Sequence, residues 1–408
     1  MQNYIKAPQN CTGCALCANV CSKDAIRMIW SKEGFLIPEV NTHACVNCGL
    51  CVKQCIALEG KETYTDDLNS VVAYGGWNRD ENTHLKSSSG GIFTALANKI
   101  ISQGGIVYGV VWKDKLTAVF DKAETIEELD RMRGSKYTPA IPHDVYRKAK
   151  QELKRNRQVL FSGTPCQIHA LKKYMGKDFD NLLTIDIVCH GVPSHLILEQ
   201  YIAEAEKNTD KKVSYISFRD KPEGWRNFHV AMHRNDGSIT STSLRDDLYM
   251  KLFLSDLALN YACYNCPYAH LPRQGDITLG DFWGVERYHS NWPIDKGISS
   301  IIANSKKGKD ALQEISPSIY LSDEPFKNIY SGQSVVYIRP HKQIPNDRAL
   351  VLEKLQEWPL KRVVDKIINT VKIRGFRCKR HGFIHRVWLK LKKLKQRITS
   401  FSIRKNSQ

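Results

Sequence analysis

Two groups of four cysteines near the amino terminus have the same spacing. The pattern C-x2-C-x2-C-x3-C occurs first at Cys11, Cys14, Cys17 and Cys21 and again at Cys45, Cys48, Cys51 and Cys55. Two-residue spacers let three thiolates converge from one loop on three corners of an iron–sulfur cubane, whereas the fourth thiolate points toward a neighbouring cluster. The spacing therefore predicts two [4Fe–4S] clusters with crossed ligands, one held by Cys11, Cys14, Cys17 and Cys55 and the other by Cys45, Cys48, Cys51 and Cys21.

This arrangement is typical of two-cluster bacterial ferredoxins. A disulfide framework is one alternative, but the first twenty residues lack the apolar centre of a secretion signal, and a reducing compartment keeps thiols free. A zinc module is the other, but zinc sites use paired C-x2-C knuckles rather than triplets with a remote fourth ligand. We therefore expect a ferredoxin domain over residues 1–60, with a hairpin at residues 25–38 that packs against the clusters.

The elements that follow alternate between helix and strand. Residues 61–83, rich in Gly, Asn and Asp, predict a linker, and residues 84–340 predict one domain. In that domain apolar periodicity predicts strands at 106–112, 158–161, 182–188 and 213–218, with helices at 91–102, 143–155, 194–207 and from 167. Such alternation predicts an α/β unit with a largely parallel sheet, in which ligands bind beyond the carboxyl ends of the strands.

Three loops of this domain carry residues suited to chemistry. Ser87-Ser-Ser-Gly-Gly91 opens a helix and offers backbone N–H groups to a phosphate or flavin tail, although an N-cap alone would explain it. Cys166 stands between a strand and a helix N-terminus, where a thiolate is stabilised. Cys189 directly follows the strand at 182–188, so it lies at a strand's carboxyl end.

Further on, Cys263 and Cys266 form a C-x2-C pair. With Cys166 and Cys189 they supply the four thiolates that a third [4Fe–4S] cluster or an all-cysteine zinc site needs. Spacing alone does not separate these two sites, and it leaves open that Cys166 and Cys189 are buried as small hydrophobic residues. The remaining one of the 13 cysteines is Cys378, for which we expect no ligand role.

Six segments of the domain follow one another in order: Ser87-Ser-Ser-Gly-Gly91, Arg133-Gly-Ser-Lys-Tyr137, Ser162-Gly-Thr-Pro-Cys-Gln167, Cys189-His-Gly-Val-Pro-Ser194, Ser217-Phe-Arg-Asp-Lys221 and Asp276 to Gly284. Together they resemble the beta-subunit family of coenzyme F420-reducing hydrogenases and related dehydrogenases. Members fused to a two-cluster ferredoxin are common in bacterial polysaccharide gene clusters, so the resemblance also implies a role in surface-glycan synthesis.

The resemblance implies an FAD site in the α/β domain and a further [4Fe–4S] cluster beside it. Carried onto this chain, the implied cluster ligands are Cys166, Cys189, Cys263 and Cys266, and the implied flavin contacts are Ser88, Ser89, Gly90, Gly91 and Lys136. Lys136 and Arg219 are candidates for neutralising phosphates or stabilising a reduced, anionic flavin, although a lone basic residue is more often an ion-pair partner. The substrate stays open, as does the choice among F420, a nicotinamide and a ferredoxin as exchange partner.

The net charge of +18 is concentrated in the carboxyl-terminal part of the chain. Residues 361–408 contain 16 lysines or arginines and one acid, so the preceding 360 residues carry only +3. Helically spaced apolar residues beside lysines predict an amphipathic helix on an anionic membrane surface; the apolar positions are Ile384, Val387, Trp388, Leu391, Leu394 and Ile398. Docking of this helix on the body is the alternative. We expect no nucleic-acid binding, because no aromatic platform or reader motif is present.

We therefore expect the α+β fold class: a ferredoxin-like domain, an α/β flavin-binding domain and a basic helical tail at residues 341–408. The expected function is that of a cytoplasmic iron–sulfur flavoprotein oxidoreductase, peripheral at the inner membrane face, which passes electrons between its clusters and a flavin that reduces or oxidises a small molecule. The alternatives are an electron-transfer subunit for a partner enzyme and a non-redox assembly factor of a glycan complex.

Overall fold

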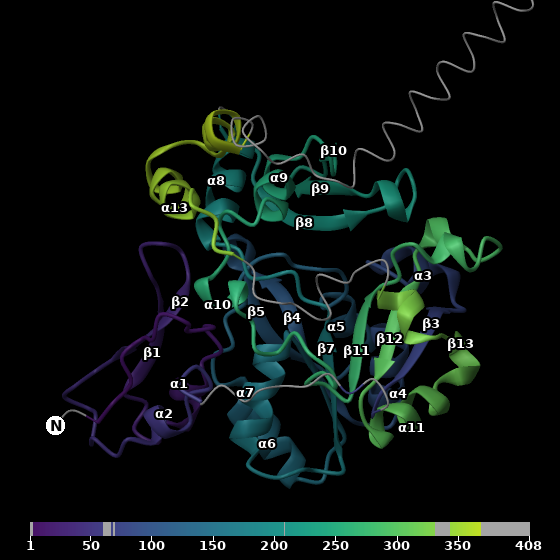
Figure 1. Ribbon diagram of the computed structural model, residues 1–408, viewed down its shortest axis with the longest axis horizontal. Helices are drawn as coiled ribbons and strands as arrows, with labels where there is room; N and C mark the ends of the chain where they lie inside the picture. Colours follow the sequence, from purple (N-terminus) through teal and green to yellow (C-terminus); the bar gives the residue numbers. More distant parts are fainter. Residues whose placement is uncertain (1–2, 60–66, 68–69, 208, 331–342, 369–408) are drawn as a thin grey trace, which may run out of the picture. The chain divides into compact units, whose positions relative to one another are not determined.

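A computed structural model describes residues 3–59, 67, 70–207, 209–330 and 343–368 of the chain (Figure 1). It divides into two units, residues 1–360 and 361–408. Within the described residues, no helix is long and apolar enough to cross a membrane. The predicted amphipathic helix and Cys378 lie outside the described residues.

The predicted start of the basic tail at residue 341 is wrong. Helix α13 (Arg348–Glu357) belongs to the first unit, where it packs against α8 (His195–Ala205). Helix α14 (Leu360–Val363) and a π-helical turn (Val364–Ile368) follow at the boundary of the two units. Apolar residues of α13, among them Val351 and Leu355, are buried, so this segment is part of the body rather than of a solvated tail.

The amino-terminal domain contains two short helices and a hairpin. Its elements are α1 (Leu16–Val20), β1 (Ile26–Trp30), β2 (Leu36–Val40) and α2 (Leu50–Lys53). The strands pair antiparallel from Ile26 opposite Val40 to Trp30 opposite Leu36, so the predicted hairpin is confirmed. Gly34 has a φ of 76°, which the tight turn between the strands requires and which glycine adopts without strain.

An eight-stranded sheet forms the centre of the body (Figure 1). Its order is β13-β3-β12-β11-β7-β6-β4-β5, and its strands are β3 (Val72–Asn78), β4 (Ile106–Lys113), β5 (Thr117–Ala123), β6 (Val159–Gly163), β7 (Leu182–Ile187), β11 (Ile277–Asp281), β12 (Ser299–Ala303) and β13 (Ile319–Asp323). Neighbours β4, β6, β7 and β11 are parallel, whereas β5, β12, β3 and β13 pair antiparallel. The prediction of a largely parallel sheet therefore holds only for its middle. A short connection after β4 and a longer one after β11, with two 3-10 turns, return the chain antiparallel.

The predicted linker at residues 61–83 is wrong over its second half. Strand β3 lies inside the sheet between β12 and β13, and helix α3 (Glu81–Lys86) follows it. The segment Val72-Ala-Tyr-Gly-Gly-Trp-Asn78 resembles a loop in sequence because two adjacent glycines interrupt its apolar pattern. Those glycines are required by packing, since a Cβ on Gly75 would meet the ring of Trp292 at 2.7 Å.

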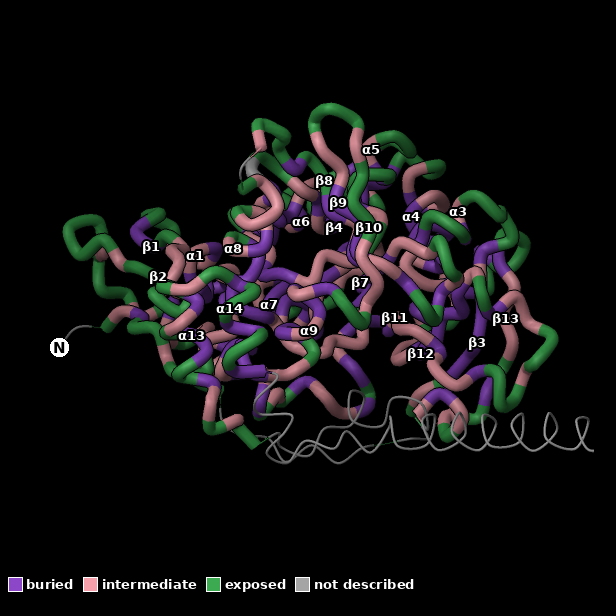
Figure 2. Tube along the Cα trace, turned by 90° about the horizontal axis from the view of Figure 1, so that it is seen from above, coloured by how far each residue is buried: buried purple, intermediate pink, exposed green. Residues whose placement is uncertain are grey.

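Helices cover both faces of the sheet because side chains alternate along each strand. In β4, Val107 and Val111 face a core shared with α4 (Ile92–Ser102), α5 (Ile126–Asp130) and α11 (Lys306–Glu314). Tyr108 faces the opposite core, shared with α6 (Val145–Lys154) and α7 (Pro165–Met175). This second core also contains Leu16 and Ile56, so the amino-terminal domain packs on the α6–α7 face. Figure 2 shows buried residues along central strands of the main sheet such as β7, and exposed residues at many of the turns.

A second, three-stranded antiparallel sheet lies apart from the first. It contains β8 (Val213–Asp220), β9 (His229–Arg234) and β10 (Ile239–Ser243), and α9 (Leu248–Leu254) and α10 (Tyr261–Tyr264) follow it. The predicted strand at 213–218 therefore exists but does not extend the parallel sheet. Five short 3-10 turns lie between these elements: Asp114–Leu116, Trp225–Asn227, Val285–Arg287, Ile294–Lys296 and Ser316–Ser318. Residues 326–330, after β13, are helical.

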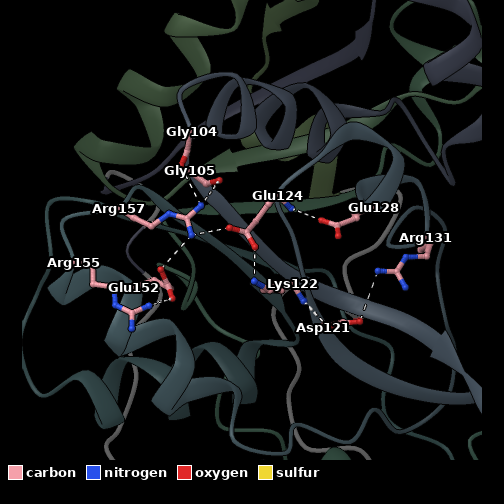
Figure 3. Close-up of polar contacts among 10 residues, drawn as sticks. All are labelled: Gly104, Gly105, Asp121, Lys122, Glu124, Glu128, Arg131, Glu152, Arg155 and Arg157. Atoms are coloured by element: carbon pink, nitrogen blue, oxygen red, sulfur yellow. Dashed lines mark hydrogen bonds and ion pairs between the residues drawn. The ribbon is translucent and has the colours of Figure 1, made fainter.

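A network of ion pairs ties down the edge of the main sheet beyond β5 (Figure 3). Arg157 contacts Glu124 at 2.7 Å and Glu152 at 3.2 Å, and it also donates to the carbonyls of Gly104 and Gly105. The network joins the ends of β5 and α6 to the start of β4. It thereby anchors the segment from β5 through α5 that leads to Arg133–Tyr137.

Candidate functional site

Three cysteines of the first group gather with Cys55 of the second in the amino-terminal domain. Burial, with the nearby charges of Cys11 and Cys55, raises the pKa of Cys14 to about 12. The pKa of Cys17 is raised by burial and by the charges of the same group. Four such thiolates would repel one another in a poorly hydrated site unless iron supplied positive charge, and backbone N–H groups of Gly13 and Leu16 already point at their sulfurs. We name Cys11, Cys14, Cys17 and Cys55 the inner cysteines; their chemistry fits a [4Fe–4S] cluster.

The other four cysteines of this domain lie closer to solvent. Cys48 is exposed, Cys45 is partly exposed, and Cys51 is buried in the small core that Cys21 also borders. The N–H of Ile5 donates to the sulfur of Cys51 at 3.3 Å, and the N–H of Ala25 donates to the sulfur of Cys21 at 3.4 Å. Such N–H···S bonds stabilise thiolates and tune the potentials of clusters that they hold. We name Cys21, Cys45, Cys48 and Cys51 the outer cysteines.

Four cysteines far apart in the sequence line one cavity of the body, which we name the four-cysteine cavity. They are Cys166, Cys189, Cys263 and Cys266. Burial raises the pKa of Cys166 far above its ordinary value, and the charges of the other three add to this shift. Thr164 exchanges a hydrogen bond with the sulfur of Cys166 at 3.2 Å, and the N–H of Val192 donates to that of Cys263 at 3.3 Å.

The backbone around these cysteines explains why they meet. Cys166 follows β6 in the first turn of α7, where Thr164 forms a capping box, and Cys189 leaves the carboxyl end of β7. Gly191 has a φ of 143°, and a Cβ there would meet Leu259 at 2.8 Å, so the loop after Cys189 requires glycine. Within the described residues, no three His, Cys, Asp or Glu converge tightly enough for a single metal ion.

A larger cavity of about 330 Å³ adjoins the four-cysteine cavity, and we name it the main cavity. Its volume lies within the range of small-molecule sites. The amino-terminal domain contributes Thr12, Gly13, Phe35 and Leu36 to its wall. Thr12 and Cys166 line both cavities. The two are therefore separated by a single layer of residues.

Five of the six predicted flavin contacts line the main cavity: Ser88, Ser89, Gly91, Lys136 and Arg219. Gly90 does not line it. Its N–H donates to the Ser299 hydroxyl at 2.9 Å, and a Cβ there would overlap the backbone of Gly76. Gly90 is thus needed for the close approach of two backbone segments.

The loop before α4 offers its backbone rather than its hydroxyls to an anion. Gly91 occupies the N-cap with a left-handed backbone and provides no side-chain cap, while Ile92 and Phe93 line the cavity. The serine hydroxyls bond to neighbouring segments of the protein: Ser89 donates to the Ile298 carbonyl at 2.8 Å, and Ser88 accepts from the N–H of Ser135 at 2.9 Å. The uncapped N–H groups of an eleven-residue helix suit a phosphate.

Arg219 is committed to protein partners. Its side chain is 5% exposed and contacts both carboxylate oxygens of Asp281, at 2.7 and 3.1 Å. It also donates to the Tyr137 hydroxyl and to the Ser88 carbonyl, both at 3.2 Å. Arg219 therefore ties three walls of the cavity together, and Asp281 compensates its charge.

Lys136 is buried beside the same wall. Its ammonium donates to the carbonyls of Met132, Arg133 and Gly134 at 3.2–3.3 Å. Burial lowers the pKa of Lys136 to about 7, whereas three carbonyl acceptors favour the charged form. Because all three N–H groups of the ammonium donate to these carbonyls, Lys136 attracts a ligand by its charge and not by hydrogen bonds.

Several lining residues were missed by sequence reasoning. Asp281 lies within the segment from Asp276 to Gly284, but nothing in that segment marks it as the partner of Arg219. Thr12 and Phe35 belong to a different domain, and no local pattern predicts their contact with the main cavity. Asp276 itself is structural, because its carboxylate accepts from Thr184 at 2.6 Å and from Ser305 at 2.7 Å.

Comparisons with known proteins cover most of the chain. Two segments match the family described as "Coenzyme F420 hydrogenase/dehydrogenase, beta subunit": residues 73–145 match its amino-terminal region and residues 156–328 its carboxyl-terminal region. Residues 10–57 match the family described as "4Fe-4S dicluster domain". A search of curated proteins gave no match. Among solved structures, the chain is similar to one from the xenon-derivatised F420-reducing [NiFe] hydrogenase complex of Methanosarcina barkeri, with 17% identity and a TM-score of 0.44 over 78% of this chain and 97% of that chain.

Proposed function

Because the chain belongs to the coenzyme F420 hydrogenase/dehydrogenase beta subunit family and carries an N-terminal 4Fe-4S dicluster domain, we propose that it is an iron–sulfur electron-transfer subunit of an oxidoreductase. One observation carries the proposal: Thr12 and Cys166 line both the four-cysteine cavity and the main cavity. The dicluster domain, the four-cysteine cavity and the main cavity therefore adjoin one another within the first unit.

In this proposal the inner and outer cysteines hold one [4Fe–4S] cluster each, the four-cysteine cavity holds a third, and the main cavity holds FAD. When bound, clusters transfer single electrons, and a flavin links single-electron exchange to two-electron chemistry. The helix α4 N-terminus and the Lys136 charge support binding of the anionic half of FAD. Arg219 acts as a positioning residue, since it joins Ser88, Tyr137 and Asp281 around the cavity.

The exposure of the cysteines suggests a direction for electron transfer. Cys48 is exposed at one end of the dicluster domain, so electron exchange with a partner protein is easiest there. Toward the body the packing becomes continuous, because Cys14, Tyr146 and Cys166 belong to the same hydrophobic core. The hydroxyl of Tyr146 donates to the Cys14 carbonyl at 2.9 Å, and burial together with the charges of Cys14 and Cys166 raises the pKa of Tyr146. The ring of Tyr146 thus excludes water from the space between the two sites.

The partner-enzyme function is favoured over a self-contained enzyme that acts on a small molecule, because both family descriptions name a beta subunit. The comparisons give no support to the surface-polysaccharide role. A non-redox assembly factor would need the clusters only as structural elements and would leave the main cavity without a function.

The test is cofactor content after anaerobic reconstitution of the full chain. We expect about twelve irons and one flavin per chain. About eight irons would refute the third cluster, and the absence of flavin at twelve irons would refute the cofactor assigned to the main cavity. Reduced protein should then pass electrons to a one-electron acceptor protein faster than to small molecules; reduction of small molecules alone would refute the subunit function.

Two cysteine variants provide a matched comparison. Cys166→Ser should lower the iron content from about twelve to about eight per chain, because a cubane needs four ligands. Cys378→Ser should leave it unchanged, since that cysteine has no assigned ligand role. Equal iron content in the two variants would contradict the ligand assignment.

A further inference from the structure

Arg273 lies in the wall of the four-cysteine cavity. Its side chain is only 2% exposed. Among the described residues that line this cavity it is the one lysine or arginine. A guanidinium is charged at all relevant pH values, so the wall carries a permanent positive charge away from water.

The last two residues of β7, Asp186 and Ile187, orient the guanidinium. Its Nε lies 3.8 Å from Oδ1 of Asp186, and Nη2 donates to the carbonyl of Ile187 at 3.3 Å. Asp186 is fully buried, and its other oxygen accepts the N–H groups of Gln274 and Gly275 at 3.0 and 3.1 Å. Arg273 lines the cavity whereas Asp186 does not, so the positive end of this pair faces the cysteines.

A purely structural ion pair is the simpler explanation, but the placement argues against it. Taking two charges out of water is unfavourable, and apolar residues of the same volume often stabilise such a site as well or better. The structure nevertheless sets a charge beside four thiolates that already need compensation. A [4Fe–4S] core with four thiolates is an anion that gains one more negative charge on reduction, so a fixed nearby cation stabilises the reduced form more than the oxidised form.

We propose that Arg273, oriented by Asp186, raises the reduction potential of a [4Fe–4S] cluster bound by Cys166, Cys189, Cys263 and Cys266. This inference rests on the third cluster of the proposed function. It makes that cluster a favourable electron acceptor for the inner cysteines' cluster and a local reservoir beside the main cavity. The effect is electrostatic, so Arg273 raises the reduction potential of the cluster and Asp186 lowers it.

The experiment is a redox titration of the reconstituted full chain followed by electron paramagnetic resonance. In Arg273→Gln the ratio of reduced to oxidised third cluster at a fixed potential should fall at least tenfold, which is a shift of about 59 mV to lower potential for one electron. In Asp186→Asn the ratio should rise. Arg273→Lys keeps the charge and should lie between wild type and Arg273→Gln. Arg157→Gln, which removes an arginine from the ion-pair network of Figure 3, should leave the ratio unchanged.

The outcomes separate this inference from the proposed function. About eight irons in the wild type would refute the third cluster itself. Twelve irons with an unshifted potential in Arg273→Gln, or shifts of the same sign in Arg273→Gln and Asp186→Asn, would overturn the role of Arg273 alone. If Arg273→Gln failed to retain the cluster, Asp186→Asn would decide: a raised potential supports the inference, and an unchanged or lowered one overturns it.

Discussion

Replacement of Arg219 by glutamine tests whether this residue organises the main cavity or holds a cofactor phosphate. In the structure its guanidinium contacts both oxygens of Asp281, and that carboxylate is 17% exposed. Removing one partner of a buried pair typically costs about 3–5 kcal/mol, because the other charge stays buried without compensation. The partial exposure of Asp281 places the expected loss of unfolding free energy for Arg219→Gln at the lower end, about 3 kcal/mol.

The double variant Arg219→Met with Asp281→Leu should recover most of this loss. It leaves no buried charge. The bonds from Arg219 to Tyr137 and Ser88 are lost in both variants, so the penalty specific to the double variant is the indole N–H of Trp225, which loses its 3.1 Å bond to Asp281 at a cost of about 1 kcal/mol. We therefore expect the double variant to be about 2 kcal/mol more stable than Arg219→Gln.

Urea unfolding followed by tryptophan fluorescence is a suitable assay, because Trp225 stacks on Trp283 at 4.4 Å beside this ion pair. Arg226→Gln is the matched control: its side chain is 47% exposed, and its loss should cost less than about 1 kcal/mol. A loss below about 1 kcal/mol for Arg219→Gln, or a double variant no more stable than the single one, would refute the reasoning. Loss of flavin affinity at unchanged stability would instead mean that Arg219 holds the cofactor directly.

Three further predictions concern the loops and the domain contact. Gly191→Ala places a Cβ 2.8 Å from Leu259, so the variant should lose the third cluster's four irons and keep the other eight on iron analysis; full retention would contradict the packing argument. Gly90→Ala should weaken flavin binding in an equilibrium titration, because the added Cβ overlaps a backbone carbonyl and displaces the start of α4; unchanged affinity would separate this loop from the flavin. Burial lowers the pKa of His195, stacked on Trp30, to about 4, while the unfolded chain binds this proton near its ordinary pKa of 6.5. The unfolded state therefore holds more protons between pH 6.5 and 4, and stability should fall as pH falls through this window. His195→Phe should flatten that slope in urea unfolding at several pH values; an equal slope would contradict the shift.

The sequence predicts many local elements well. Apolar periodicity predicts helices at 91–102 and 143–155, and the structure has α4 and α6 there with bounds within two residues. Strong periodicity over ten or more residues explains this success. Strand β3 escapes prediction because its two adjacent glycines look like a turn signal, whereas in the sheet Gly75 makes room for Trp292 and Gly76 for the backbone of Tyr320. Strand β5 follows a short connection, whereas β12 and β13 follow longer ones that contain 3-10 turns or a helix. The antiparallel direction of all three depends on which neighbour they pair with rather than on their own residues.

The sequence alone predicts the ligand role of the eight amino-terminal cysteines. Cubane ligands with two-residue spacers belong to a single loop, so recognising them needs no information from the rest of the chain. For Cys166 and Cys189 the sequence located only the loops at the ends of two strands. Their meeting with Cys263 and Cys266, the pairing of Arg219 with Asp281 and the contact of Thr12 with the main cavity were decided by tertiary structure. Each joins residues tens to hundreds of positions apart. The core that α6, α7 and the dicluster domain share packs against Cys166 and Cys266, and a separate core with Trp225 and Phe282 lies beside Arg219 and Asp281.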